Sequence, residues 1–408
     1  MRTASTIVFL FIHALLVARI CVVQPGHRIR EALASTADCD TVLVESGTYR
    51  EGIIRIERPV VLIGKGRPVI DGENTGDVLV VAAPHVTVKG FVIRGTRVSD
   101  MNDNAGIKCV SATDIVLVDN QLEGCFFGIH LSSVSRALIA DNVLAGDPAT
   151  PENRRANGIH LWKCDHVDVL RNVAHDHRDG IYFEFVTDSH VGENESHHQA
   201  RYGLHFMFSH RDSYTHNHFH DNGAGVAVMF THEVTMTNNR FERNRGASAY
   251  GLLLKEINDA TIEGNLFADN TVGMFVDGCN RARIKDNRFQ GNGWAVKLFA
   301  NSTATTFTRN TFTSNTFDMS TNGDLVLTTL SGNHWDRYRG YDLDHDGTGD
   351  VPHHPMSMFS LVTERMPFAM VLSRSLMVNL LEQGERIVPT LTPAALEDKT
   401  PLMRAPHG

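Results

Sequence analysis

The sequence predicts an all-β fold, a right-handed parallel β-helix with a C-terminal helical extension. Three observations predict it: a period of about 22 residues, an Asn at the same place in successive repeats, and alternating apolar residues in short strands. Periods of 20 to 50 residues indicate repeat architectures, and short β-rich units favour coils that stack about 4.8 Å apart. We therefore expect each repeat to form one coil around a continuous core.

The first 25 residues are expected to form a signal peptide. One Arg precedes an apolar run from Ile7 to Val17, which is too short to span a bilayer and is typical of a secretory segment. An uncleaved anchor is the alternative, because Arg19 lies where a small residue is usual before a cleavage site. Both readings predict export.

The composition of the chain excludes some classes of protein. The chain has 408 residues, of which 42% are hydrophobic and 21% charged, as in ordinary globular proteins. Removing residues 1–25 removes two Arg and no acid, so the formal charge falls from −9 to −11. An acidic chain is not expected to bind nucleic acid. Six cysteines are too few for a disulfide framework, and Cys109 falls at a core position, which predicts a buried thiol.

The repeats set the domain boundaries. Segments of the form Gly-apolar-x-apolar recur with spacings of 22 or 23 residues, lengthened to 30 and 26 where loops are inserted, and Ala295 starts a degenerate copy. We expect coils from about residue 42 to 335 within a β-helix domain of residues 26–340, and a C-terminal domain of residues 341–408. Repeat arrays need covered ends, so residues 27–40 and a segment beyond 340 are expected to cap the coils. The repeats begin at Gly106, Gly128, Gly158, Gly180, Gly203, Gly225, Gly251 and Gly273.

Fourteen residues after each of these glycines stands an Asn. Asn tolerates left-handed backbone and can hydrogen-bond to equivalent residues in the coils above and below. We expect a structural ladder at one corner of the coil, without a catalytic role. Its members are Asn120, Asn142, Asn172, Asn194, Asn217, Asn239, Asn265 and Asn287.

Strand alternation assigns inward and outward positions. The first and third residues after each Gly are apolar and are expected to point inward, as in Ile107 and Cys109 or Leu204 and Phe206. The second and fourth residues then point outward.

The outward positions bring soft metal donors together. His205 and Met207 share a strand, Met229 follows Met207 on the next rung, and Glu184 precedes Met207. Thioether and imidazole donors favour Cu(I), and a carboxylate helps when copper is oxidised. The sequence therefore predicts a transient, exposed copper site at these four residues, with His160 on the same face as a further candidate ligand. The structural alternative is a Met-rich strand that packs under a partner.

Two further metal sites are weaker candidates. His175, His197 and His220 share one position on successive coils, which predicts either a second metal-binding stack or a solvated turn. Near the C-terminus, Asp342, Asp344, Asp346 and Asp350 have the spacing that starts a calcium loop. His353 stands where that loop needs a bidentate Glu, so an Asp-rich turn without an ion is the alternative.

The C-terminal segment is unusually apolar. A helix is expected to begin at Pro367 and to remain apolar on most sides up to Leu381. It can cap the β-helix or bind another protein, and the two roles are compatible. The expected partner-binding residues are Pro367, Phe368, Leu372, Leu376 and Leu380.

Several segments together resemble the NosD family of periplasmic β-helix proteins, over nearly the whole mature chain. They include "RDGIYFEF", "RYGLHFMFS", "VAVMFTHEV", "GYDLDHDGTGDVPHHP" and the terminal "DKTPLM". The resemblance implies a non-enzymatic role in delivering copper to nitrous oxide reductase during denitrification. It also implies an ABC-type ATPase and its membrane permease as partners, together with the reductase and a copper-donating chaperone. The chain departs from the family at His334, which replaces an aromatic residue, and at His345, where Gly is common.

Two other functions remain open. β-Helices of this coil length include carbohydrate lyases, epimerases and hydrolases, and Tyr182, Glu184, His160 and Lys255 could serve as acid–base residues there. Such an enzyme should carry aromatic residues and acids on several rungs, whereas the central outward positions are Met, Ala and Leu. The third reading is a metal-free clamp that docks the reductase on the transporter.

Overall fold

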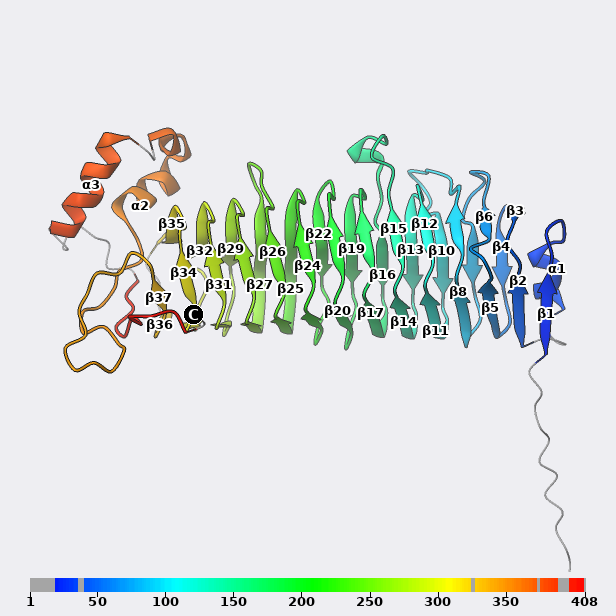
Figure 1. Ribbon diagram of the computed structural model, residues 1–408, viewed down its shortest axis with the longest axis horizontal. Helices are drawn as coiled ribbons and strands as arrows, with labels where there is room; N and C mark the ends of the chain where they lie inside the picture. The colour runs from blue at the N-terminus through cyan, green and yellow to red at the C-terminus, as the bar shows by residue number, and fades with distance from the viewer. Residues whose placement is uncertain (1–18, 36–39, 324–326, 373–374, 388–395, 407–408) are drawn as a thin grey trace, which may run out of the picture.

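The computed structural model describes residues 19–35, 40–323, 327–372, 375–387 and 396–406. Over these residues the chain is a long right-handed parallel β-helix, with a short helix at its N-terminal end and a helical extension at the other (Figure 1). The predicted fold class is therefore confirmed. Among the described residues, no helix is both long enough and apolar enough to cross a bilayer.

Each coil contributes strands to three parallel ladders. Two ladders are joined in a 24-stranded sheet, because the long strands β25 and β27 belong to both. The first ladder runs through β16, β19, β22 and the beginning of β25, and the second through β17, β20, β23 and the end of β25. The strands of this sheet are β1 (Ile20–Val23), β2 (Thr41–Val44), β4 (Ile54–Ile56), β5 (Val60–Gly64), β7 (Leu79–Val81), β8 (Val86–Lys89), β10 (Ala105–Val110), β11 (Thr113–Val118), β13 (Phe127–Ser132), β14 (Ser135–Ala140), β16 (Ile159–Trp162), β17 (Asp165–Leu170), β19 (Asp179–Glu184), β20 (His190–Gly192), β22 (Tyr202–Met207), β23 (Ser213–Thr215), β25 (Ala224–Thr237), β27 (Tyr250–Glu263), β29 (Val272–Asp277), β30 (Arg283–Lys285), β32 (Trp294–Leu298), β33 (Thr306–Thr308), β35 (Phe317–Ser320) and β36 (Thr329–Ser331).

The third ladder is a separate sheet of 13 strands within the described residues. Its short strands alternate outward, inward and outward, so that only the middle residue enters the core. They are β3 (Thr48–Arg50), β6 (Val69–Asp71), β9 (Val92–Arg94), β12 (Gln121–Glu123), β15 (Val143–Ala145), β18 (Val173–His175), β21 (Glu195–His197), β24 (His218–His220), β26 (Arg240–Glu242), β28 (Leu266–Ala268), β31 (Arg288–Gln290), β34 (Thr311–Thr313) and β37 (His334–Trp335).

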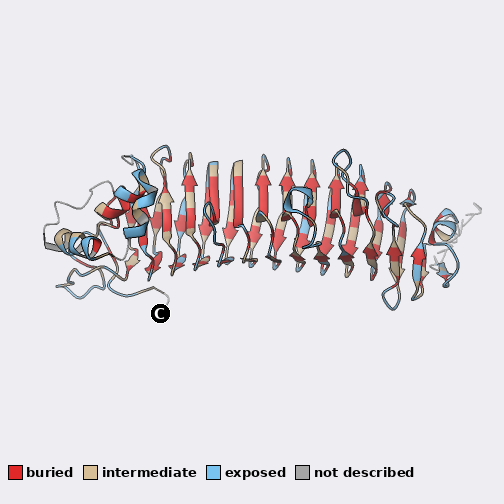
Figure 2. Cartoon of the chain, turned by 90° about the horizontal axis from the view of Figure 1, so that it is seen from above, coloured by how far each residue is buried: buried red, intermediate tan, exposed pale blue. Residues whose placement is uncertain are grey.

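The inward positions form one continuous apolar core along the rod (Figure 2). Ile107, Cys109, Leu204 and Phe206 are fully buried, as the alternation predicts. In the third ladder, six aromatic side chains stack face to face with neighbouring ring centroids 4.1 to 5.8 Å apart. Equivalent residues on neighbouring coils therefore pack on one another, which explains the strict sequence period. This inner stack runs from Phe219 and Phe241 through Phe267, Phe289 and Phe312 to Trp335.

All eight predicted Asn residues are buried and form a hydrogen-bonded ladder. Each bonds the next, as where the backbone N and Nδ2 of Asn194 donate to Asn217 Oδ1 at 3.0 Å. The predicted backbone conformation was wrong. The left-handed residue is the one before each Asn, such as Asp119 or His216, because the Asn side chain points inward while its neighbour makes the bend. The ladder continues through Asn310 and Asn333.

The N-terminal boundary lies earlier than expected. Residues 1–18 of the predicted signal peptide lie outside the described residues, but Ile20–Val23 form β1, which pairs with β2. Cys21 on this strand is disulfide-bonded. A boundary at residue 25 would remove a strand of the first coil, so any cleavage that preserves this coil falls before Ile20. Helix α1 (Ile29–Ala34) lies over this end with Ile29 and Leu33 buried (Figure 1).

The C-terminal extension differs from the single helix predicted from Pro367. Helix α2 (Met358–Arg365) precedes a 3₁₀-helix, η2 (Pro367–Leu372), and α3 (Leu376–Ile387) follows. Phe359 of α2 packs against Phe317 of β35, which anchors the extension to the last coils. The chain then returns to the β-helix, where Asp398 accepts hydrogen bonds from the backbone N and Nδ2 of Asn333. Asp398 is thus the terminal rung of the Asn ladder.

Candidate metal centres

The outer surface of the first ladder brings the predicted copper ligands together. Strand pairing places Met207 beside Met229 on one side and beside Glu184 on the other, as the coil register predicts. Both Met side chains and Glu184 are half-buried, so a metal can reach the two sulfurs from solvent. Lys255 pairs with Met229 on the next rung and bounds this cluster. We call His205, Met207, Met229 and Glu184 the first-ladder cluster.

His205 is more enclosed than predicted, with only 6% of its surface exposed. Its Nδ1 lies 3.6 Å from a carboxylate oxygen of Asp179 and 3.2 Å from a guanidinium nitrogen of Arg201. Burial alone would raise the pKa of Asp179, but hydrogen bonds from Arg201 and His205 hold it below its ordinary value. An ion pair between the fully buried Asp179 and the partly exposed Arg201 therefore positions the imidazole.

The other imidazole nitrogen of His205, Nε2, is buried and has no hydrogen-bond partner among the described residues. Nδ1 can accept a hydrogen bond from Arg201 or carry the proton toward Asp179, and Nε2 lacks a partner in both tautomers. A buried polar atom without a partner costs about 1–3 kcal/mol. A metal at Nε2 removes this cost and selects the tautomer with Nδ1–H facing Asp179, an arrangement common for metal-bound His.

His160 is not adjacent to His205. Tyr182 lies between them in a column of rings on the first ladder, with centroids 4.7 Å from His160 and 4.8 Å from His205. His130 extends the column on the far side of His160. Burial, and secondarily the neighbouring His130, lowers the pKa of His160 to about 3, so this imidazole is neutral at physiological pH.

Tyr182 contacts the first-ladder cluster directly, which the sequence did not reveal. Its hydroxyl donates toward Glu184 at 3.4 Å and toward the Met207 sulfur at 3.7 Å. Burial, followed by the charge of Glu184, raises the pKa of Tyr182 to about 12. The neutral phenol therefore holds Glu184 and Met207 together on one side of the cluster.

An aromatic ridge borders the cluster, with Phe185 and Phe208 exposed and Phe230 half-buried. Phe185, Phe208 and Phe230 follow Glu184, Met207 and Met229 in sequence and stack with centroids 5.4 and 5.0 Å apart. All three have left-handed backbone, with φ between 50° and 57°, a conformation unfavourable for bulky residues. Three aromatic residues at strained, solvent-facing turns indicate a contact surface. The sequence signal was a Phe five residues after Gly180, Gly203 and Gly225.

The predicted stack of His175, His197 and His220 forms, but in a geometry that cannot chelate one ion. Ring centroids are 5.2 and 5.0 Å apart and the ring planes lie within 16° of parallel. Imidazole lone pairs lie in the ring plane, so parallel rings direct them side by side instead of toward one point. His220 instead lies close to Glu195 and His218.

The Asp-rich loop brings three of its four predicted ligands together. Asp342, Asp344 and Asp346 have carboxylate oxygens within 4.8 Å of one another. Asp350 instead accepts a hydrogen bond from the backbone N of Leu343 at 2.7 Å. Gly347 has φ of 89°, which only glycine adopts readily. The loop therefore has the glycine turn of a calcium site, but Asp350, one of the four predicted ligands, binds the backbone instead.

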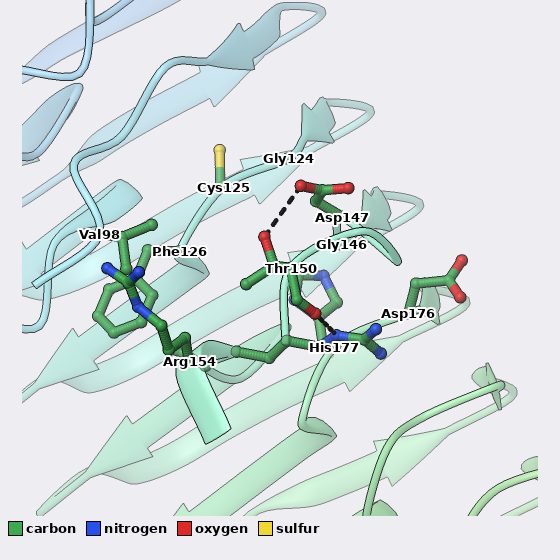
Figure 3. Close-up of a pocket in the computed structure, with 12 residues that line it drawn as sticks. Val98, Gly124, Cys125, Phe126, Gly146, Asp147, Thr150, Arg154, Asp176 and His177 are labelled. Carbon is green, nitrogen blue, oxygen red and sulfur yellow. Dashed lines mark hydrogen bonds between the residues drawn. The ribbon is translucent and has the colours of Figure 1, made fainter. Parts of the chain in front are cut away.

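A small pocket lies elsewhere, on the turns that follow β12, β15 and β18 (Figure 3). Thr150 donates to Asp147 at 2.9 Å, and Arg155 bonds the Thr150 carbonyl at 2.7 Å, so these polar groups hold the inserted loop of residues 146–156. Burial lowers the pKa of His177, which lines the pocket, to about 4. The pocket contains none of the predicted site residues and has a structural explanation.

Fold and surface together define a parallel β-helix with metal donors on its outer face. The family model described as "Periplasmic copper-binding protein (NosD)" matches residues 142–340. Two relatives, from Pseudomonas aeruginosa and Stutzerimonas stutzeri, are each 28% identical over 88% of this chain, and the match covers 87% and 86% of their lengths. Both are named "Probable ABC transporter binding protein NosD". The chain is therefore similar to NosD proteins over the matched residues.

Solved structures resemble the chain in fold only. The A-module of the mannuronan C-5 epimerase AlgE6 from Azotobacter vinelandii superimposes with a TM-score of 0.56, covering 75% of this chain and 93% of that module. The two sequences are 14% identical. At this identity the likeness shows a shared β-helix and does not extend to the epimerase's chemistry.

Proposed function

We propose that this chain is a periplasmic accessory protein that works with an ABC transporter, an ATPase plus a permease, to deliver or insert copper during maturation of nitrous oxide reductase. The family description as a periplasmic copper-binding protein and the relatives' names as ABC transporter binding proteins support this role. The cargo is Cu(I), held transiently by His205, Met207 and Met229, with Glu184 as a weaker fourth ligand.

One observation carries the proposal: the buried, unpartnered Nε2 of His205, two residues along the strand from Met207, which pairs with Met229 on the next rung. Asp179 and Arg201 fix the imidazole, whereas the Met side chains are flexible and half-buried. One rigid and two adaptable soft donors suit an ion that must enter and leave. This division fits a carrier better than a closed structural site.

Partner exchange requires docking surfaces. The ridge of Phe185, Phe208 and Phe230 adjoins the cluster, so a copper donor or the reductase can contact both at once. At the C-terminal end, Phe368, Leu372, Leu376 and Leu380 are all exposed, which is unusual for apolar side chains of this size. We assign these four residues to the permease contact. The side chain of Pro367 lies outside the described residues.

The test removes both sulfurs by exchanging each thioether side chain for a hydrocarbon one. Met207→Leu/Met229→Leu conserves volume and apolarity, so it should cost less than about 1.5 kcal/mol of stability per site. We expect the double variant to fold but to lose Cu(I) after anaerobic loading and desalting, and cells carrying it to accumulate reductase without its copper centre. Met236→Leu is the matched control, because Met236 lies on the same strand but points into the core.

Two outcomes would contradict the proposal. Normal Cu(I) retention and full maturation in the double variant would move the copper site away from the first ladder. A wild-type chain that binds no Cu(I), while both it and the double variant support maturation through the transporter, would make the protein a metal-free docking clamp. The carbohydrate reading has no specific support, because the likeness to sugar-modifying enzymes is one of fold.

A further inference from the structure

The outer face of the third ladder carries a second group of metal donors. In the His-Phe-His sequence of β24, Phe219 points into the core and both His218 and His220 point outward. Glu195 pairs with His218 from the preceding coil. One donor atom from each of these three residues lies within 4.8 Å of the other two. We call Glu195, His218 and His220 the third-ladder cluster.

We propose that the third-ladder cluster is a separate metal site that binds a divalent transition-metal ion such as Zn²⁺ or Cu²⁺. Two imidazoles and one carboxylate are a ligand set that such ions favour, and the cluster has no sulfur donor to select Cu(I). The site lies on a different ladder from the proposed copper cluster and shares no residue with it. It does not depend on the proposed copper delivery.

The contacts of His220 show where the ion binds. Its Nδ1 lies 2.7 Å from Asp221, which Arg243 holds in turn at 2.8 Å. This hydrogen bond places the imidazole proton on Nδ1 and leaves the Nε2 lone pair facing Glu195 Oε1 at 3.0 Å. Two acceptors at this distance repel unless a proton or a metal ion lies between them. Two ligands of a tetrahedral zinc ion are separated by roughly 3.3 Å, close to the distance already present.

The imidazole rings around the cluster pack closely. The ring of His218 lies 4.1 Å from that of His220, and His197 stacks on His220 at 5.0 Å. His218 therefore brings a second imidazole to the point where His220 and Glu195 meet.

The charges around the cluster favour a cation. Three carboxylates face two guanidinium groups, which leaves one negative charge uncompensated. Glu242, on the next coil, lies 2.8 Å from His218 Nε2 and can orient this ring as Asp221 orients His220. Both proposed His ligands thus have the carboxylate support typical of metal-bound imidazoles. The charged groups are Glu195, Asp221, Glu242, Arg240 and Arg243.

The experiment titrates the full exported chain, purified without a polyhistidine tag, with Co²⁺ and Zn²⁺. Bound Co²⁺ should show the strong visible absorption of a tetrahedral site, and Zn²⁺ affinity is measured by calorimetry. We expect Glu195→Gln and His218→Ala to abolish the Co²⁺ signal. Asp221→Asn, which removes only the orienting carboxylate, should weaken Zn²⁺ binding about 10- to 100-fold.

His175→Ala is the matched control, because it removes a half-buried His from the same ladder two coils away. It should bind Zn²⁺ as the wild type does, and so should Met207→Leu/Met229→Leu, which separates this site from the copper proposal. Folding of each variant is checked by its thermal unfolding without metal. Unchanged Zn²⁺ binding in folded Glu195→Gln and His218→Ala variants, or its loss in the double Met variant, would overturn the assignment.

Discussion

The inner and outer faces of the same coils repeat in different ways. Along the inner corner, one residue type occupies every rung from Asn120 to Asn333, and each contacts the next through the same pair of hydrogen bonds. Along the outer column of the first ladder, the chemistry changes from rung to rung. That column runs through Lys108, His130, His160, Tyr182, His205, Ala227, Leu253, Phe275 and Lys297.

The difference follows from what each position must satisfy. An inner Asn bonds backbone groups that recur identically in every coil, such as the Val191 carbonyl at 2.9 Å from Asn217 Nδ2. Outer side chains contact one another on neighbouring rungs, some exposed and some buried, so the fold does not dictate their type. Donor residues on adjacent outer rungs therefore indicate function, whereas a repeated inner polar residue indicates structure.

The largest effect should come from breaking the inner repetition. Asn217→Leu removes the hydrogen bonds to Val191 O and Asn239 Oδ1 and the two that Asn217 Oδ1 accepts from Asn194. At about 1–3 kcal/mol for each buried group left unpaired, we expect a loss of at least about 3 kcal/mol in the free energy of unfolding. Thr235→Val, at an outward position on β25 in the next coil, is the control, expected within about 0.5 kcal/mol of wild type. Similar urea midpoints for the two variants would contradict the structural role of the ladder.

Much of the fold could be predicted because the inner face repeats. The period, the strand alternation and the Asn positions gave the β-helix and its register. The chain ends could not be predicted in this way, because Ile20–Val23 and Asp398 join the coils outside the repeat pattern. The helix boundaries beyond residue 355 were also missed, since this segment has no period to read.

For the first-ladder cluster, the sequence predicted which residues lie on neighbouring rungs, but not how deeply each side chain is buried. Adjacent outward rungs place Met207 beside Met229, whatever the surrounding loops do. The burial of His205 depends on Arg201 and Asp179, which the repeat pattern does not single out. The contacts of His220 depend on the direction of its side chain. His220 stacks nearly parallel to His197 and directs Nε2 toward Glu195, whereas a chelating His stack would direct its nitrogens toward one point.

An intermediate effect should come from an inner acid that breaks the Asn and apolar pattern. Asp212 is 1% exposed, and burial raises its pKa to about 8. The folded state therefore keeps a proton that the unfolded chain releases near pH 4. Stability should fall as pH rises from about 4 to 8, by at most about 1.4 kcal/mol per pH unit. Asp212→Asn should remove this decrease.

The comparison is the difference between the unfolding free energies of Asp212→Asn and wild type, measured at several pH values. Buried histidines such as His160 and His177 have lowered pKa values, so their contribution to stability rises with pH up to about pH 6.5, opposite to that of Asp212. Their contribution is the same in both proteins and cancels in the difference. Asp188→Asn is the control, because Arg211 lowers the pKa of that outer carboxyl to about 2 and its contribution is lost only in acid. A pH-independent difference between pH 5 and 8 would show that Asp212 is ionised in the folded protein.

The smallest effect on stability, with a large effect on assembly, should come from the outer apolar residues of the C-terminal extension. Phe368 is 91% exposed and Leu376 is 74% exposed, so neither supports the core. Phe368→Ser/Leu372→Ser/Leu376→Ser should therefore change the free energy of unfolding by less than about 0.5 kcal/mol per site. Co-purification with the permease should be lost, because the exposed apolar surface is the proposed contact.

The control for this variant is Phe359→Ala, whose side chain packs on Phe317 at the end of the coils. It should cost about 3 kcal/mol or more through the cavity left behind, while the permease contact survives in whatever fraction remains folded. Deletion of the whole extension would not separate loss of stability from loss of the permease contact, because it also removes Asp398 from the end of the Asn ladder. If the triple Ser variant still co-purifies with the permease, the exposed apolar residues lie outside the contact, and the outer face of the coils themselves becomes the surface to test.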